Sequence, residues 1–146
     1  MKTSMIALLL VLFTFGQVHA QKIYSTKAAT VRFIAVDDKD IDATNTKAVS
    51  RLEANGKLSF IMLMKDFGFE MDLMQKHFND EYVESDKFPR GIFNGQITNI
   101  KSVNFTKDGS YPIMVKGNMQ VHGVNKAIQT NGLIVISKGV AKASAK

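Results

Sequence analysis

The clearest pattern in this sequence is the alternation of apolar and polar residues. Over residues 111–122 nearly every second side chain is apolar and its neighbours are mostly polar, which is typical of a half-buried strand. Val31, Phe33 and Ala35 alternate in the same way. Residues 57–71 are expected to form another strand region, whose first half looks buried on both faces. The pattern therefore predicts a mostly β-protein.

Turn-forming dipeptides separate the alternating stretches. Asn55-Gly56 and Asp108-Gly109 favour tight hairpins, whose two central residues have positive φ. We expect the second of them to join a strand over residues 103–105 to the long strand that follows. His122-Gly123 is expected to turn the chain again before a strand over residues 126–137.

Two further dipeptides, Asn94-Gly95 and Asn131-Gly132, lie inside apolar runs. We expect bulges or sharp bends at these positions, because curved sheets need such distortions. Several short strands joined by tight turns predict a sandwich or a barrel.

Residues 72–81 break the β-pattern. Apolar and aromatic residues recur there at helical spacing, and Asp72 is placed to cap the first turn with Gln75 three residues later. Asn79 is suited to end the helix, and Phe88-Pro89 requires an extended exit. We expect a short helix that covers part of the sheet or one end of a barrel.

The N-terminus has the features of a cleavable secretion signal. Lys2 provides a positive charge, residues 6–15 are almost unbroken apolar sequence, and Val18-His19-Ala20 supplies a small-residue cleavage site. The apolar run is far shorter than the roughly 20 residues of a membrane-spanning helix. We therefore expect a signal peptide over residues 1–20, a mature domain over residues 21–146, and a periplasmic or secreted location.

Composition is consistent with one exported domain. The chain has 146 residues, of which 45% are hydrophobic, and no cysteine, so it forms no disulfide. A small exported domain without disulfides fits a bacterial periplasm. The formal net charge is +6, but the lysines are scattered, whereas nucleic-acid binders cluster their basic residues. We expect no nucleic-acid partner, at most transient contact with membrane surfaces, and a monomer or homodimer.

The residue patterns that carry catalysis or metal binding are missing from this sequence. It contains no cysteine nucleophile, no G-x-S-x-G elbow, no phosphate-binding loop and no acid–base pair at useful spacing. The acidic stretch over residues 37–42 lacks the glycine and the closing glutamate of an EF-hand loop. His77 and His122 alone are too few for a zinc site. We expect a protein that is not an enzyme and that needs no metal and no cofactor.

Two regions of the sequence resemble the YceI-like family. The first comprises Leu73-Met74-Gln75-Lys76-His77-Phe78-Asn79, residues 84–89 and Phe93-Asn94-Gly95. The second, residues 115–126, resembles that family's G-x-L-x-x-x-G-V-T-K stretch, with Asn125 where threonine is commoner. The resemblance implies an exported, lipocalin-like antiparallel β-barrel with one short helix near residues 72–81. It also implies an interior that binds polyisoprenoid or similar lipid chains.

Members of this family usually continue through at least one further strand after the region that corresponds to residues 132–136. This sequence ends instead in the weakly apolar residues 140–146. We therefore expect a C-terminally truncated member, whose barrel is open, swapped with a neighbour or unstable, because unpaired sheet edges attract pairing.

The alternation supplies candidate lining residues for a lipid cavity. A barrel of about eight strands has room for one slim ligand, and burial of a lipid tail gains about 0.8 kcal/mol per CH₂. The inward face stays open, because both faces of residues 58–64 are apolar. The candidates are Phe67, Phe69, Met71, Met74, Phe93, Ile113, Val115, Met119, Val121 and Ile134.

From these features we expect a non-catalytic, exported carrier that holds a long apolar lipid such as a polyisoprenoid inside a barrel. The alternative is a structural or stress-response domain whose core is filled by its own side chains and that has no lipid ligand.

Overall fold

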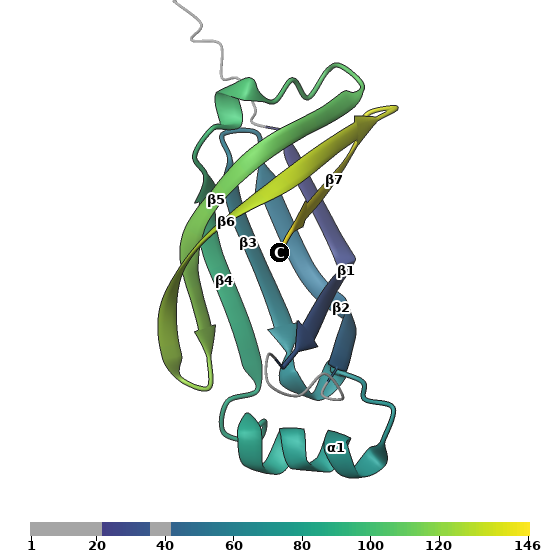
Figure 1. Cartoon of the computed structure of the whole chain (residues 1–146). Helices are drawn as coiled ribbons and strands as arrows, with labels where there is room; N and C mark the ends of the chain where they lie inside the picture. Colours follow the sequence, from purple (N-terminus) through teal and green to yellow (C-terminus); the bar gives the residue numbers. More distant parts are fainter. Residues whose placement is uncertain (1–21, 36–41) are drawn as a thin grey trace, which may run out of the picture.

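The computed structural model describes residues 22–35 and 42–146. Seven antiparallel strands form one sheet in sequence order, and the sheet curls into a nearly closed barrel (Figure 1). The strands are β1 (Ile23–Ile34), β2 (Asp42–Glu53), β3 (Lys57–Leu63), β4 (Arg90–Ile97), β5 (Gly109–Val121), β6 (Val124–Ser137) and β7 (Val140–Ala145). The predicted lipocalin-like antiparallel barrel with one short helix is confirmed. The signal peptide expected over residues 1–20 and the acidic residues 37–41 lie outside the described residues.

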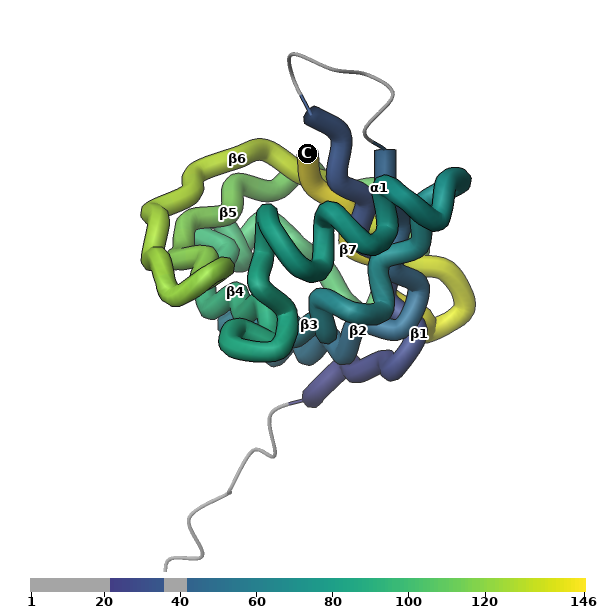
Figure 2. The backbone as a smooth tube through the Cα atoms, turned by 90° about the horizontal axis from the view of Figure 1, so that it is seen from below, coloured from purple at the N-terminus to yellow at the C-terminus, as the bar shows by residue number. Residues whose placement is uncertain are grey.

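Helical segments lie at both ends of the barrel. The helix α1 (Asp72–His77) continues into a π-helical turn, η2 (Phe78–Tyr82), and Figure 2 shows α1 crossing the lower end of the ring of strands. A 3₁₀ turn, η1 (Met64–Asp66), follows β3. A second one, η3 (Ile100–Ser102), lies in the connection from β4 to β5 over the upper end (Figure 1).

The ends of the helical segment differ from the expectation. The capping role predicted for Asp72 is wrong, because no side chain of a described residue caps the first turn. The Gln75 carboxamide oxygen instead accepts a hydrogen bond of 3.3 Å from the backbone N–H of Phe69. Asn79 does not end the segment, which continues to Tyr82; its amide donates to the backbone oxygen of Gln75 at 2.9 Å.

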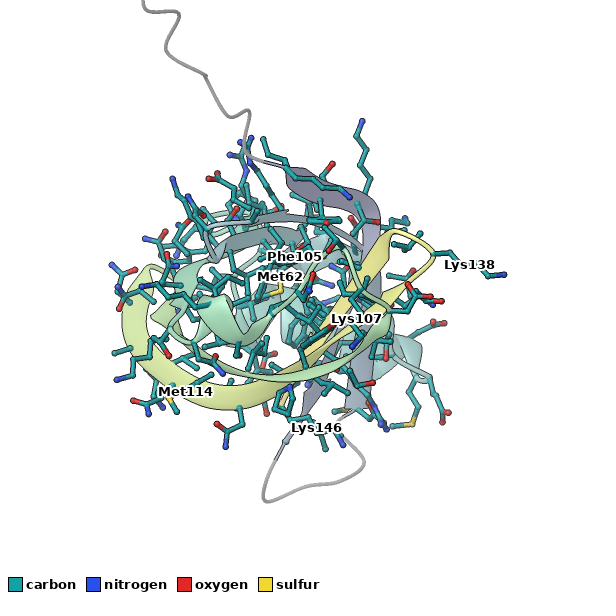
Figure 3. The ribbon with its side chains drawn as sticks, turned by 90° about the horizontal axis from the view of Figure 1, so that it is seen from above. Met62, Phe105, Lys107, Met114, Lys138 and Lys146 are labelled. Atoms are coloured by element: carbon teal, nitrogen blue, oxygen red, sulfur yellow. The ribbon has the colours of Figure 1, made fainter. Side chains whose placement is uncertain are left out.

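Side chains fill the upper half of the interior. Tyr24 and Phe105 stack there with ring centroids 5.2 Å apart, and Figure 3 shows Phe105 inside the ring of strands. The buried residues of this upper cluster are Leu52, Phe93, Ile97, Val103, Ile113, Val115, Ile134 and Ile136. Since burial of apolar surface is the main stabilising contribution to folding, the upper cluster is a structural core of the domain.

The lower half holds a second cluster, which joins the sheet to the helical segment. Its buried residues are Ala43, Ala48, Met62, Met64, Phe67, Phe78 and Val83. Figure 3 shows Met62 inside the ring of strands, whereas Met114 lies outside it. Five residues of this lower cluster border a cavity: Met62, Met64, Phe67, Phe78 and Val83.

The strand region expected over residues 57–71 ends early. β3 stops at Leu63, and η1 turns the chain before Phe67. The 3₁₀ turn interrupts the alternation, so Phe67 is buried although it shares parity with Ile61 and Leu63, which are 44% and 48% exposed. The expectation that the first half is buried on both faces is therefore wrong. The inward face carries the even-numbered residues of β3, including Met62.

Two of the predicted turns are confirmed and one is wrong. Asn55-Gly56 lies in the β2–β3 hairpin, with positive φ (92°) at the glycine alone, and His122-Gly123 forms the β5–β6 turn with φ of 53° and 69°. Asp108-Gly109 makes no hairpin, because residues 103–105 are not a strand. Their apolar side chains cover the upper core instead, and Asp108 Oδ1 accepts a hydrogen bond of 2.9 Å from the N–H of Lys138.

The glycines within strands permit close approach of neighbouring backbones. Gly95 and Gly117 pair across β4 and β5, and the register through them is continuous, so the expected bulge at Asn94-Gly95 is wrong. A Cβ atom at Gly117 would lie 2.4 Å from the carbonyl oxygen of Asn94 and 2.7 Å from the ring of Phe93. The register through Asn131-Gly132 is also continuous. These glycines therefore fit the alternative expectation of bends in a curved sheet.

A buried asparagine organises the irregular pairing of β1 with β2. The register shifts twice between Thr26 and Val31, and Asn45 lies beside one of the shifts with 0% exposure. Its Nδ2 donates to the backbone oxygen of Leu63 at 3.0 Å, and its Oδ1 accepts from the N–H of Lys47 at 2.9 Å. The side chain therefore satisfies two backbone groups that the strand ladder does not pair.

Replacing Asn45 by alanine is expected to lower the free energy of unfolding by about 2 kcal/mol, because two partly buried backbone groups lose their partners. Urea denaturation at neutral pH measures this change. The exposed neighbour Thr46, replaced by alanine, serves as the control and should cost less than about 0.5 kcal/mol. Equal stability of the two variants would show that the Asn45 side chain contributes no net hydrogen-bond energy.

The outermost strands of the sheet are β1 and β7. The weakly apolar residues 140–146 do form a strand over most of their length, with Ile134 opposite Ala143 and Ile136 opposite Ala141. Within residues 22–35 and 42–146, however, no ladder of hydrogen bonds joins β7 to β1. The barrel thus has a seam between these two edges.

Candidate functional site

A cavity of about 520 Å³ lies in the lower half of the barrel, between the sheet and the helical segment. This volume is within the range of about 300–1,000 Å³ that is usual for small-molecule sites. The cavity is lined from β1, β3, β5, β6 and the segment from η1 to Val83, so distant parts of the chain build it. The lining residues are Phe33, Ala35, Met62, Met64, Phe67, Phe69, Met74, Phe78, Tyr82, Val83, Met119, Val121, Val124, Lys126 and Ile128.

The lining is apolar and buried at its base and exposed to solvent at its rim. Met64 and Phe67 at the base are almost fully buried. Tyr82 and Val124 at the rim are 63% and 64% exposed. Lys126 is the one ionisable group other than the Tyr82 phenol among the lining residues. Such a site favours an apolar ligand through burial, since it has few groups that could hydrogen-bond within it.

Aromatic contacts hold the helical segment over the cavity. Phe78 is buried, and its ring lies 4.9 Å from that of Phe69, 5.7 Å from that of Phe67 and 6.2 Å from that of Phe33, measured between centroids. Phe78 thus connects η2 to β1 and to the loop after η1. Aromatic pairs at these distances add to the energy of burial. We call the helical segment, residues 72–82, the lid of the cavity.

A polar cluster fastens the end of this lid to the β5–β6 turn. Glu84 Oε2 lies 2.8 Å from His122 Nε2, and the other carboxylate oxygen accepts a hydrogen bond from Lys87 Nζ. The ring of Phe88 meets the edge of the His122 ring with centroids 4.6 Å apart. The hydrogen bond from Lys87, followed by that with His122, holds the pKa of Glu84 below its ordinary value.

The pKa of Glu84 predicts an acid-sensitive contribution to stability. A carboxyl whose folded pKa is depressed stabilises the fold above its unfolded pKa, and this stabilisation is lost as pH falls through the folded pKa. Glu84→Gln should therefore be less stable than the wild type at neutral pH, and the difference should shrink below the ordinary glutamate pKa of about 4.3. Thermal unfolding across pH measures it. Glu81→Gln, which changes an exposed glutamate nearby, should show no such convergence; convergence in both variants would contradict the role of Glu84.

The ten residues predicted from the sequence to line a cavity fall into three groups. Phe67, Phe69, Met74, Met119 and Val121 lie around the cavity. Four others lie in the packed upper cluster, away from it: Phe93, Ile113, Val115 and Ile134. Met71 is 56% exposed and lines a second, more polar pocket of about 820 Å³ together with Arg32 and Asp42.

Several lining residues were not among the predicted ones. Met62 and Met64 lie on the even-numbered face of β3, which the sequence left open because both faces are apolar. Phe33 belongs to an alternating stretch that predicted a strand. The alternation did not indicate whether Phe33 would lie in the upper or the lower half of the barrel. Phe78 lies at helical spacing from Met74, which was the signal that could have included it. Lys126 has no sequence signal beyond its parity with the apolar residues of β6.

Comparison with known proteins gives a likeness of fold. No protein-family model matches this sequence, and no curated protein matches it significantly. Among solved structures, a polyisoprenoid-binding domain from Saccharophagus degradans, described as implicated in plant cell wall breakdown, superposes with a TM-score of 0.65 at 10% sequence identity. The two chains share a fold. The match covers 82% of this chain and 71% of the other.

Two further observations concern what the described residues contain. No helix within them is long and apolar enough to cross a membrane. No group of three or more histidine, cysteine, aspartate or glutamate side chains in residues 22–35 and 42–146 is placed to hold a metal ion.

Proposed function

We propose that this protein is an exported, non-catalytic carrier that holds the tail of a long apolar lipid, polyisoprenoid-like in shape, in the cavity of its lower half. The observation that carries the proposal is the cavity itself, because about 520 Å³ of space bounded by methionine, phenylalanine and valine is not filled by the protein's own side chains. Methionines such as Met62 and Met64 suit a pocket that adapts to a flexible chain. The shared fold with a polyisoprenoid-binding domain supports the same proposal.

Membership of the YceI-like family and export through a signal peptide over residues 1–20 belong to the same proposal. Export gives the cavity a purpose, since a lipid with a long apolar tail needs a carrier to cross an aqueous compartment. Sequencing the N-terminus of the protein recovered from a bacterial periplasm tests this part, and Gln21 is the expected first residue.

Extraction of the purified protein with organic solvent, followed by mass spectrometry, tests the carrier proposal. We expect a lipid in near-stoichiometric amount, or uptake of an added isoprenoid alcohol by protein that was purified without one. Protein that yields no lipid and takes up none would overturn the proposal. That result would favour the structural or stress-response domain without a ligand.

A further inference from the structure

The rim of the cavity carries one positive charge, on Lys126. This residue lies on β6 opposite Met119 and shares parity with Ile128, Ile134 and Ile136, whose side chains face the interior. Its methylene stem therefore runs along the inner wall, and its ammonium group reaches the solvent side, as long basic side chains do at apolar surfaces. The other lining residues carry no charge at neutral pH.

No described residue neutralises the charge of Lys126. Lys126 makes no ion pair or side-chain hydrogen bond with any residue of the described ranges. Three acidic side chains in and beside the lid have other partners: Glu84 pairs with Lys87 and His122, Asp80 with Lys76, and Asp86 with Lys65. Asp72 and Glu81 are exposed and make no ion pair with a described residue, Lys126 included. An unpaired ammonium group beside an apolar cavity is thus available to a ligand.

We propose that Lys126 binds the anionic end of an amphiphile, a carboxylate or a phosphate, whose apolar tail occupies the cavity. This inference rests on the proposed function and adds the chemistry of the ligand's head. Ligand sites usually combine apolar walls with a small number of polar groups that fix orientation. Lys126 is placed for that role, because it is the exposed, charged residue of the cavity lining. The tail enters first and the charged head stays at the rim, where it keeps part of its hydration.

A fluorescent polyene fatty acid and its neutral methyl ester test the assignment, since they share one tail and differ in the charge of the head. The acid should bind the wild type about fivefold more tightly than the ester, as expected for one partly solvated ion pair of about 1 kcal/mol. Lys126→Gln should abolish this preference, so that acid and ester bind this variant equally. Lys116→Gln makes the same change of net charge on the outer face of β5 and should retain the preference.

The outcomes distinguish the role of Lys126 at the lipid head from the binding of the lipid tail in the cavity. Equal binding of acid and ester by the wild type, or a preference that survives in Lys126→Gln, would overturn the role of Lys126 and leave the carrier proposal standing. Failure of both probes to bind would overturn the carrier proposal and this inference together. Inorganic phosphate at matched ionic strength should not displace the acid; displacement would show a site for free anions and not for a lipid head.

Discussion

Replacing Val121 by tryptophan is expected to weaken the binding of a long apolar lipid about thirtyfold. Val121 lies on the inner face of β5 and lines the cavity near the β5–β6 turn. An indole at this position occupies space that the lipid tail would fill. Excluding two or three CH₂ groups costs about 2 kcal/mol at about 0.8 kcal/mol each, which corresponds to about thirtyfold in Kd.

Titration with a fluorescent isoprenoid alcohol measures this effect. Met114→Trp is the matched control, because Met114 belongs to the same strand but points outside the barrel (Figure 3). The control should bind as the wild type does, and neither variant should lose more than about 1 kcal/mol of stability, since Val121 borders empty space and Met114 borders solvent. A folded Val121→Trp protein with unchanged affinity would show that the lipid binds elsewhere.

The second large effect is expected at Gly117. Adding one methyl group, in Gly117→Ala, should destabilise the domain by about 3 kcal/mol, the upper end of what overpacking usually costs. The new Cβ would lie 2.4 Å from the Asn94 carbonyl oxygen and 2.6 Å from the Gly95 Cα atom. Both are backbone atoms of the neighbouring strand, so no side-chain rotation relieves the contact. On the interior side, the Phe93 ring would lie 2.7 Å from the same Cβ atom.

Urea denaturation monitored by circular dichroism measures the loss at Gly117. Gly109→Ala is the control on the same strand, because its Cβ would meet only the Tyr111 side chain, at 3.4 Å or more. This control should change stability by less than about 1 kcal/mol, since removing a glycine also restricts the unfolded chain. Similar free energies of unfolding for the two variants would mean that β4 and β5 can move apart locally without a large loss of stability.

The sequence predicted the inner face of β5 because alternation is a local property. Ile113, Val115, Met119 and Val121 all point inward, as their period of two requires. Their height in the barrel is not local, because it depends on what covers each end. Residues 98–108 cover the upper end, so Ile113 and Val115 become core, while Met119 and Val121 lie under the lid and border the cavity.

Two features could not be read from the pattern. The 3₁₀ turn at Met64–Asp66 changes which parity points inward, and nothing in the spacing of Phe67 and Phe69 marks that change. The segment of residues 98–108 that covers the upper end contains Val103 and Phe105, and apolar residues such as these would fit a strand equally well. In both cases tertiary packing determined which of two local backbone conformations of similar free energy is adopted, as it often does for short apolar runs.

The seam between β1 and β7 bears on how thick a lipid the proposed carrier could hold. In a barrel whose hydrogen bonds run around the whole circumference, strand number and stagger fix the diameter. Here the circumference is interrupted within the described residues. β7 pairs only with residues 132–137 of β6, so the lower part of β6, which carries Lys126 and Ile128 of the cavity wall, has no strand paired to it on the seam side. The two edges can move apart without breaking a backbone hydrogen bond of the ladder. The barrel can therefore widen at this seam alone. A branched lipid tail would push the two edges apart and leave the hydrogen bonds between the other strands intact.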